Sequence, residues 1–92
     1  MTDLEKVIRN GLVIMYLETP SEAIQLAAVC QNALAIMYIE HPSEEVKLAA
    51  VRTNWRAIGC IKNPSEEVKN VAIQQNREAI EYIKNPSKIT HI

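Results

Sequence analysis

The chain repeats one pattern of apolar and polar positions every 22 residues. Three units open on a proline (Pro20, Pro42 and Pro64), followed seven residues later by a short apolar block such as Ala27-Ala28-Val29. An asparagine and a second apolar run follow at a constant spacing, the run being for example Ala35, Ile36 and Ile39. Apolar residues three and four apart are typical of helices that bury one side. The four prolines are Pro20, Pro42, Pro64 and Pro86. Each unit therefore predicts two short helices, the first of about 12 residues and the second of about two turns.

The tetrapeptide around each proline predicts where the first helix begins. In Thr19-Pro20-Ser21-Glu22 we expect Thr19 as the N-cap, proline at the first helical position and Glu22 closing a capping box. Asn63 repeats this role in a later unit, and Thr2 to Glu5 is a version without proline. His41 is a poorer cap, so its helix start should be weaker by roughly 1 kcal/mol.

Asn10, Asn32, Asn54 and Asn76 recur at the junction between the two predicted helices. They are expected either as left-handed caps at the end of the first helix or as the start of the second. A ladder of asparagines that binds a ligand is the alternative.

Together these signals predict an all-α fold in which short αα-hairpins stack as a small right-handed solenoid, a rod roughly 35–40 Å long. The first helices, apolar over most of their circumference, should form an inner layer and the second helices an outer one. The single helical-repeat domain spans 1–92, divided into units 1–19, 20–41, 42–63 and 64–85 and a degenerate cap, 86–92. Because Lys88 replaces the capping glutamate, we expect a degraded capping repeat rather than a truncated array.

The outer helices differ from unit to unit, and these differences are the main functional signal. Their outward face is expected at the first, second, fifth and eighth residues after the asparagine. In the last unit these are charged (Arg77, Glu78, Glu81, Lys84), whereas the first two units are mostly apolar there. The predicted interface consists of Leu12, Met15, Leu34, Met37 and Trp55 with Arg52 and Arg56, and Ile8 and Cys30 extend the apolar part. Coverage of the patch by the N-terminal unit itself is the alternative to an interface.

Composition sets limits on the function. Of 92 residues 48% are hydrophobic, only 4% are aromatic, and the net charge is −1. Residues 1–41 carry two basic and five acidic side chains, and residues 42–92 carry eight basic and six acidic. Neither a membrane span nor a secretory signal is evident, so we expect a cytosolic protein without a membrane partner.

The sequence offers little catalytic chemistry. Cys30 and Cys60 occupy different repeat positions and form no zinc spacing with His41 and His91, so they are expected as free thiols rather than a disulfide, with no metal or cofactor. The repeated glutamates are at helix starts, and the tyrosines Tyr16, Tyr38 and Tyr82 suggest a packing stripe. We therefore expect a protein that is not an enzyme.

The segment from Asn63 to Asn76, and less fully His41 to Asn54, resembles the short helical repeats of uncharacterised proteins from bacteriophages, large DNA viruses and some bacteria. The resemblance covers nearly the whole chain and implies a helical stack without a known reaction, and by analogy a phage-type protein that binds and inhibits a host factor.

Our expectation is thus a protein–protein interaction module, homodimeric through the outer helices of the first two units, with an unidentified further protein partner. One alternative is a nucleic-acid-associated protein that uses Trp55 for stacking and the basic residues of the C-terminal half, although interleaved glutamates weaken that field. Those basic residues are Arg52, Arg56, Lys62, Lys69, Arg77, Lys84 and Lys88. The other alternative is a structural spacer.

Overall fold

A computed structural model describes residues 2–84, and this part of the chain is helical, without strands. Four α-helices alternate with shorter helical segments, as the sequence predicts. The order is α1 (Asp3–Arg9), η1 (Gly11–Tyr16), α2 (Glu22–Gln31), η2 (Ala33–Tyr38), α3 (Glu44–Thr53), η3 (Trp55–Cys60), α4 (Glu66–Gln75) and α5 (Ala79–Lys84). The predicted cap, 86–92, lies outside the described residues.

The segments η1, η2 and η3 are 3₁₀ helices, which differs from the α-helical turns expected of them. A 3₁₀ helix has three residues per turn, so residues three apart lie directly above one another. The apolar residues of these segments, such as Ala33, Ile36 and Ile39, have this spacing and are all buried. The tighter helix thus places the side chains of Ala33 and Ile36 on a single line, and Ile39 follows at the extended C-cap.

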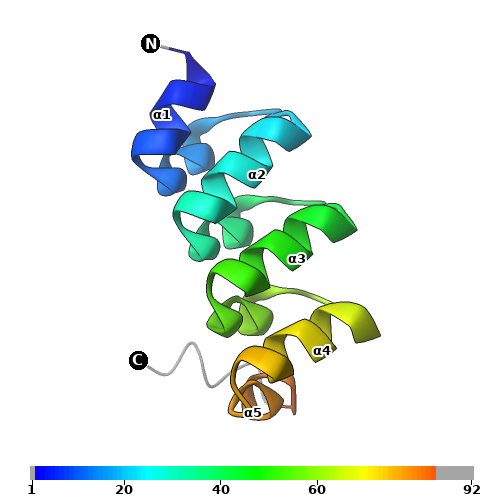
Figure 1. The fold of residues 1–92 in the computed structure, drawn as a ribbon. Helices are drawn as coiled ribbons and strands as arrows, with labels where there is room; N and C mark the ends of the chain where they lie inside the picture. Colours follow the sequence, from blue (N-terminus) through cyan, green and yellow to red (C-terminus); the bar gives the residue numbers. More distant parts are fainter. Residues whose placement is uncertain (1, 85–92) are drawn as a thin grey trace.

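Neighbouring elements pack in two layers (Figure 1). Helices α1 to α4 lie side by side in chain order, each packed on the next, and η1 to η3 form a second row behind them. The longest dimension of the molecule is 39 Å, within the expected range. Each layer has one face exposed to solvent, because Ala23 and Cys30 of α2 and Met37 of η2 are exposed. The prediction that the first helices form an enclosed inner layer was therefore wrong.

The core lies between the two layers and is wholly apolar among the described residues. Valines and alanines of the α-helices, such as Val29 and Ala50, are fully buried against isoleucines of the 3₁₀ row, such as Ile36 and Ile58. The small side chains let neighbouring helices approach closely, which suits a core with few aromatic residues.

The helix starts differ from the prediction. Ser21, Ser43 and Ser65, not Thr19, His41 and Asn63, are the N-caps, and each serine hydroxyl accepts a hydrogen bond from the backbone N–H three residues later. Pro20, Pro42 and Pro64 therefore precede their helices, in the links from the 3₁₀ row to the α row. The predicted weakness at His41 does not apply, and Asn63 instead adopts a positive φ of 50°, which asparagine tolerates. The capping box of Thr2 and Glu5 is confirmed.

The repeated asparagines start the second helix, one of the two predicted roles. The backbone N–H of Asn54 donates to the Ala50 carbonyl at 2.9 Å and ends α3, and its side-chain oxygen accepts from the Arg56 N–H at 3.0 Å and begins η3. Asn10, Asn32 and Asn76 repeat both bonds. All four have an extended φ between −151° and −161°, so the prediction of left-handed caps was wrong. Their side-chain oxygens are engaged in capping, which weighs against the ligand ladder.

Candidate interaction surface

We number the residues of the 3₁₀ row by their position after the repeated asparagine. Residues three positions apart share a side of the row. Positions 1, 4 and 7 face the core and include Ala33, Ile36 and Ile39. Positions 2 and 5 form the outward side, because they are three residues apart and therefore aligned. Placing position 1 on the outside was a mistake in the first three units, where Gly11, Ala33 and Trp55 are all buried, whereas Arg77 of the fourth unit is exposed as predicted.

The outward side is apolar in the first two units. Met15, Leu34 and Met37 are 48%, 39% and 56% exposed, and Leu12 is half-buried. We call these four residues the outer apolar face. Since η1 packs against η2, the face continues across both units. In the following units the same positions carry Arg56, Glu78 and Glu81, all exposed, and the half-buried Gly59. The predicted contrast between the two halves of the chain is therefore present in the structure.

Two tyrosines enlarge the exposed apolar area, which sequence reasoning missed. Tyr16 is 78% exposed and Tyr38 is 43% exposed, although all three tyrosines were expected in one packing stripe. Only Tyr82 packs as expected, with its ring against Trp55 of the preceding unit. Trp55 is at position 1 of its unit and Tyr82 at position 6 of the next. In the same arrangement, the residue of the preceding unit that would contact Tyr38 is Gly11, which has no side chain. For Tyr16, the described residues contain no preceding unit.

Trp55 belongs to the core rather than to the border of the exposed patch. Its side chain is 8% exposed, its ring meets Tyr82, and the Arg56 guanidinium carbon lies 4.7 Å from the ring centroid. Arg52 and Arg56 are exposed, as expected of interface residues. Ile8, 57% exposed, and Cys30 are also on the surface. Of the predicted site residues, only Trp55 is inaccessible.

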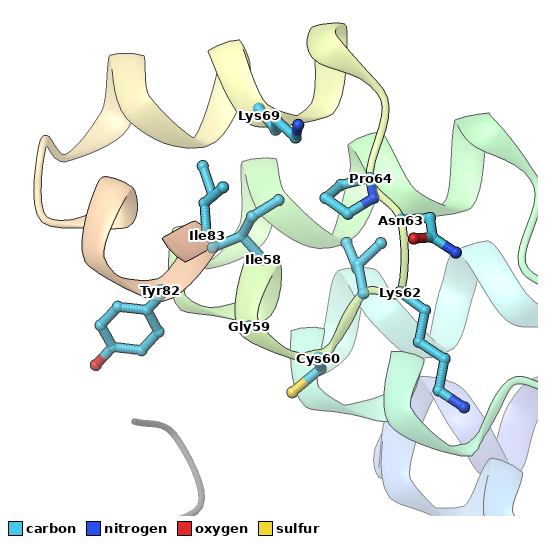
Figure 2. A pocket seen from close by; sticks show the side chains of 10 residues that line it. Ile58, Gly59, Cys60, Lys62, Asn63, Pro64, Lys69, Tyr82 and Ile83 are labelled. Atoms are coloured by element: carbon cyan, nitrogen blue, oxygen red, sulfur yellow. The ribbon is translucent and has the colours of Figure 1, made fainter. Parts of the chain in front are cut away.

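Two shallow grooves lie where consecutive units meet. One, of about 770 Å³, runs between η3 and α5 and is lined by Ile58, Cys60, Tyr82 and Ile83 with Lys62 at its edge (Figure 2). The other, of about 620 Å³, is the corresponding groove one unit earlier, with Met37, His41 and Lys47 in its lining. Cys60 and Lys62 border both. The grooves are open and their lining repeats, so they follow from the stacking of units.

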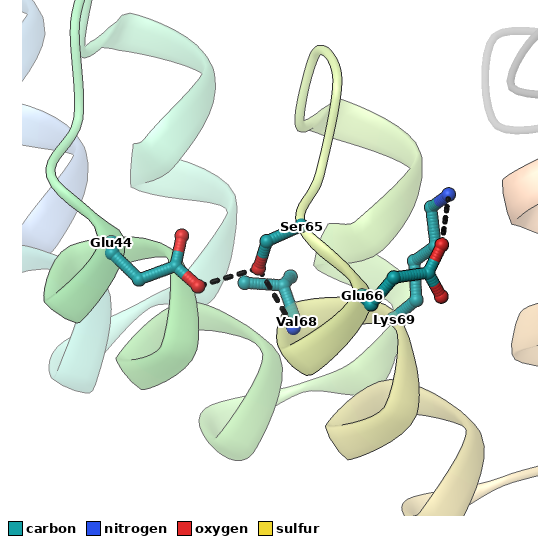
Figure 3. Close-up of polar contacts among 5 residues, drawn as sticks. All are labelled: Glu44, Ser65, Glu66, Val68 and Lys69. Atoms are coloured by element: carbon teal, nitrogen blue, oxygen red, sulfur yellow. Dashed lines mark hydrogen bonds and ion pairs between the residues drawn. The ribbon is translucent and has the colours of Figure 1, made fainter.

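Many polar contacts of the described residues lie at helix ends. The Ser65 hydroxyl, which caps α4, donates to the Glu44 carboxylate of the preceding unit, and Lys69 lies 3.5 Å from Glu66 one turn earlier in α4 (Figure 3). Hydrogen bonds from the backbone and hydroxyl of Thr2 lower the pKa of Glu5. Burial raises the pKa of the Cys60 thiol.

Within residues 2–84, no group of three or more histidine, cysteine, aspartate or glutamate side chains is arranged to hold a metal ion. Nor does any helix of this part combine the length and apolar character needed to cross a bilayer. Cys30 and Cys60 are both free thiols.

Comparison with known proteins adds no relative to this picture. No protein-family model, curated protein or solved structure matches the chain. The resemblance to viral and bacterial helical repeats, and the host target that it implies, stay predictions.

Proposed function

We propose that this chain is a short α-solenoid with no enzymatic activity, whose function is to bind protein, and that a second copy of the chain is one partner. The observation that carries the proposal is the outer apolar face. Met15, Leu34 and Met37 are each about half exposed at positions where the fourth unit carries Glu78 and Glu81. A cluster of this kind on a small protein is typical of an interface.

The size of the hydrophobic contribution favours a second copy over a polar partner surface. Burying the exposed half of a methionine or leucine contributes about 1 kcal/mol, so one copy of the face contributes about 3 kcal/mol. The cost of association is about 4–15 kcal/mol. A two-fold dimer buries the same face twice for one association cost, and Tyr16 and Tyr38 add to it. The doubled contribution of about 6 kcal/mol only just exceeds the lower limit of that cost, so we expect a weak dimer that forms at high protein concentration.

The surface available is sufficient for such a dimer. A typical stable interface buries about 800 Å² on each partner, and the molecule exposes 5969 Å² in total. An interface of that size would cover about an eighth of the surface.

Nucleic-acid binding has less support. Base stacking was assigned to Trp55, which is buried and already contacts Tyr82 and Arg56. Base stacking needs an accessible aromatic side chain near the basic residues. In the C-terminal half the remaining candidate is Tyr82, which is half-buried.

Sedimentation velocity over a concentration series tests the proposal. We expect wild type to shift from monomer to dimer, and Leu34→Asp/Met37→Asp to remain a folded monomer, because two carboxylates would be buried against the partner. Glu78→Ala, at the matching position of the fourth unit, is the control and should dimerise as wild type does. Equal association of the double variant and wild type would contradict the proposal, and circular dichroism verifies that each variant is folded.

A further inference from the structure

The two grooves between units join into one trough. They share Cys60, Ile61 and Lys62 in their lining, so they are adjacent. Each groove contains buried isoleucines and one half-buried proline, which is Pro64 in the groove of Figure 2 and Pro42 in the other. We call the two grooves together the inter-unit trough. It offers one apolar site for each junction between units.

The inter-unit trough is basic, although the chain as a whole has a net charge of −1. The charged side chains in its lining are three lysines and one glutamate, together with one histidine: Lys47, Lys62, Lys69, Glu40 and His41. In Figure 2, Lys69 lies over the groove from α4, and Lys62 extends away from it toward the preceding units. An excess of lysine around apolar sites favours a partner that carries carboxylates.

The lysine side chains are available to such a partner. Lys47 and Lys69 are half-buried, as expected where the aliphatic part of a lysine lies along a groove and its ammonium group reaches solvent. Lys69 has a weak ion pair with Glu66, whose side chain is 85% exposed, at 3.5 Å. Because an ammonium group donates three hydrogen bonds, Lys69 retains donors for a further carboxylate.

The stacking of units explains the apolar lining but not the lysines. Lys47 and Lys69 occupy the same position in α3 and α4, and α2 has Gln25 there. The position after the buried isoleucine of the link likewise changes, from Glu40 in the second unit to Lys62 in the third. Since α2 packs in the same row without a lysine, these lysines are additions that the fold does not require.

The spacing of the units indicates the shape of the partner. Four units share a length of 39 Å, so consecutive units are about 10 Å apart. Lys47 and Lys69 are one unit apart, and so are Pro42 and Pro64. A polyproline II segment has three residues per turn and rises about 3.1 Å per residue, so residues three apart lie on one side of it, about 9 Å from each other. Such a segment presents the same side chains to successive units.

We propose that the inter-unit trough binds an extended acidic segment of a partner protein, in which an aliphatic side chain and a carboxylate recur every third residue. The aliphatic side chains lie against the prolines and isoleucines, and the carboxylates pair with Lys47 and Lys69. This inference rests on the proposed protein-binding function and adds a second site with its class of partner. It does not require the dimer, because the trough shares only Met37 with the outer apolar face.

The lining favours a peptide over single-stranded nucleic acid. Bases bind by stacking on accessible aromatic rings. The one aromatic residue in the lining of the trough is Tyr82, which is half-buried and has its ring against Trp55. The isoleucines and prolines suit aliphatic side chains instead.

Fluorescence anisotropy with labelled peptides tests the occupant. The probe is a fluorescein-labelled peptide of three Glu-Pro-Leu repeats, which favours the polyproline II conformation and carries both side chains at the required spacing. We expect binding that weakens as salt rises. A Lys-Pro-Leu peptide should bind at least about tenfold more weakly because of repulsion, and a Glu-Pro-Ser peptide at least about tenfold more weakly because it lacks apolar side chains. If either control peptide bound as tightly as the probe, the inference would be wrong.

Substitution of the lysines tests the site. Lys47→Glu and Lys69→Glu should each weaken binding of the Glu-Pro-Leu peptide about fivefold to tenfold, because an attractive pair becomes repulsive. Lys6→Glu makes the same change of charge on the exposed surface of α1 and is the matched control, which should stay within about twofold of wild type. Circular dichroism verifies that each variant is folded. An equal loss in Lys6→Glu would show an effect of net charge alone and would refute the site.

Two further outcomes separate this inference from its alternatives. If an oligothymidine bound more tightly than the peptide and lost affinity in the same lysine variants, the trough would be a nucleic-acid site and the inference would be refuted. A wild type that binds the peptide but stays monomeric in sedimentation contradicts the proposed dimer alone. A wild type that dimerises but does not bind the peptide at about 1 mM refutes the trough as a peptide site alone.

Discussion

The ring of Trp55 meets the ring of Tyr82 edge to face, with centroids 5.2 Å apart and planes at 78°. This geometry is the favourable arrangement for two aromatic rings. It joins η3 to α5, so one contact connects the third unit to the fourth, and Trp55 is 8% exposed within it. An aromatic residue that looks like an interface anchor in the sequence is therefore part of the core.

Trp55→Ala should lower the free energy of unfolding by about 3–5 kcal/mol, because it leaves a cavity between two units. Arg56→Ala is the control and should cost only about 0.5–1 kcal/mol, since the exposed guanidinium contributes a cation–π contact alone. Urea denaturation followed by circular dichroism measures both, because Trp55 is the only tryptophan and its fluorescence disappears with it. Similar losses for the two variants would contradict the core assignment.

The repeat and its helices could be predicted because proline spacing and apolar runs are local signals. The type of the second helix was misread in the first three units, from a signal that was present, whereas α5 of the fourth unit is an α-helix as predicted. Ala33, Ile36 and Ile39 are spaced by three without any step of four, which is the period of a 3₁₀ helix. The prediction instead used Ala35, Ile36 and Ile39, whose spacings of three and four are typical of an α-helix, and it placed Ala33 on the outward face.

Other features could not be read from one unit alone. Thr19-Pro20-Ser21 contains two good capping residues, and which one begins the helix depends on how far the extended link must reach between the layers. The exposure of Tyr38 likewise depends on what the preceding unit offers at position 1, where Gly11 replaces a side chain. Contacts between units therefore determine the N-cap residue and the exposure of Tyr38, which the residue preferences within one unit do not.

Asn54→Ala should lower the free energy of unfolding by about 1 kcal/mol, because the N–H of Arg56 loses its acceptor at the start of η3. Asn54→Asp retains an oxygen at this position and should lose much less. Thermal unfolding of the three proteins side by side measures the difference. If the alanine and aspartate variants were equally stable, the side-chain bond would not contribute.

Gly11→Ala should destabilise the first unit, because a Cβ atom there would overlap the backbone carbonyl oxygen of Ala28 in α2. Backbone cannot move away as a flexible side chain can, so α1 and η1 would have to separate from α2. The expected loss is about 1–3 kcal/mol. Ala33→Gly, at the same position of the next unit, is the reverse change, and hydrogen exchange of α1 amides should report faster opening only in Gly11→Ala.

Helix α1 should lose stability in acid through Glu5. The hydrogen bonds that the backbone N–H and the hydroxyl of Thr2 donate to this carboxyl lower its pKa in the folded protein, so the ionised form stabilises the helix start. That stabilisation is complete above the unfolded pKa of about 4.3 and is lost as the pH falls through the lower folded value. Glu5→Gln should remove this pH dependence. Amide exchange of α1 in both proteins across this range measures it, and parallel curves would contradict the role of Glu5.

The two thiols should react at different rates, because their surroundings differ although both are free. Cys60 lies half-buried between two grooves, and burial raises the pKa of its thiol, so less of the reactive thiolate is present at neutral pH. Cys30 is exposed at the end of α2. With a thiol-reactive chromogenic disulfide we expect Cys30 to react at least about tenfold faster, as measured separately in Cys60→Ala and Cys30→Ser. The reaction of Cys60 should accelerate as the pH rises toward its raised pKa. Equal rates in the two variants would mean that Cys60 is as accessible as Cys30. The packing of η3 against α5 would then be looser than the contact of Trp55 with Tyr82 implies.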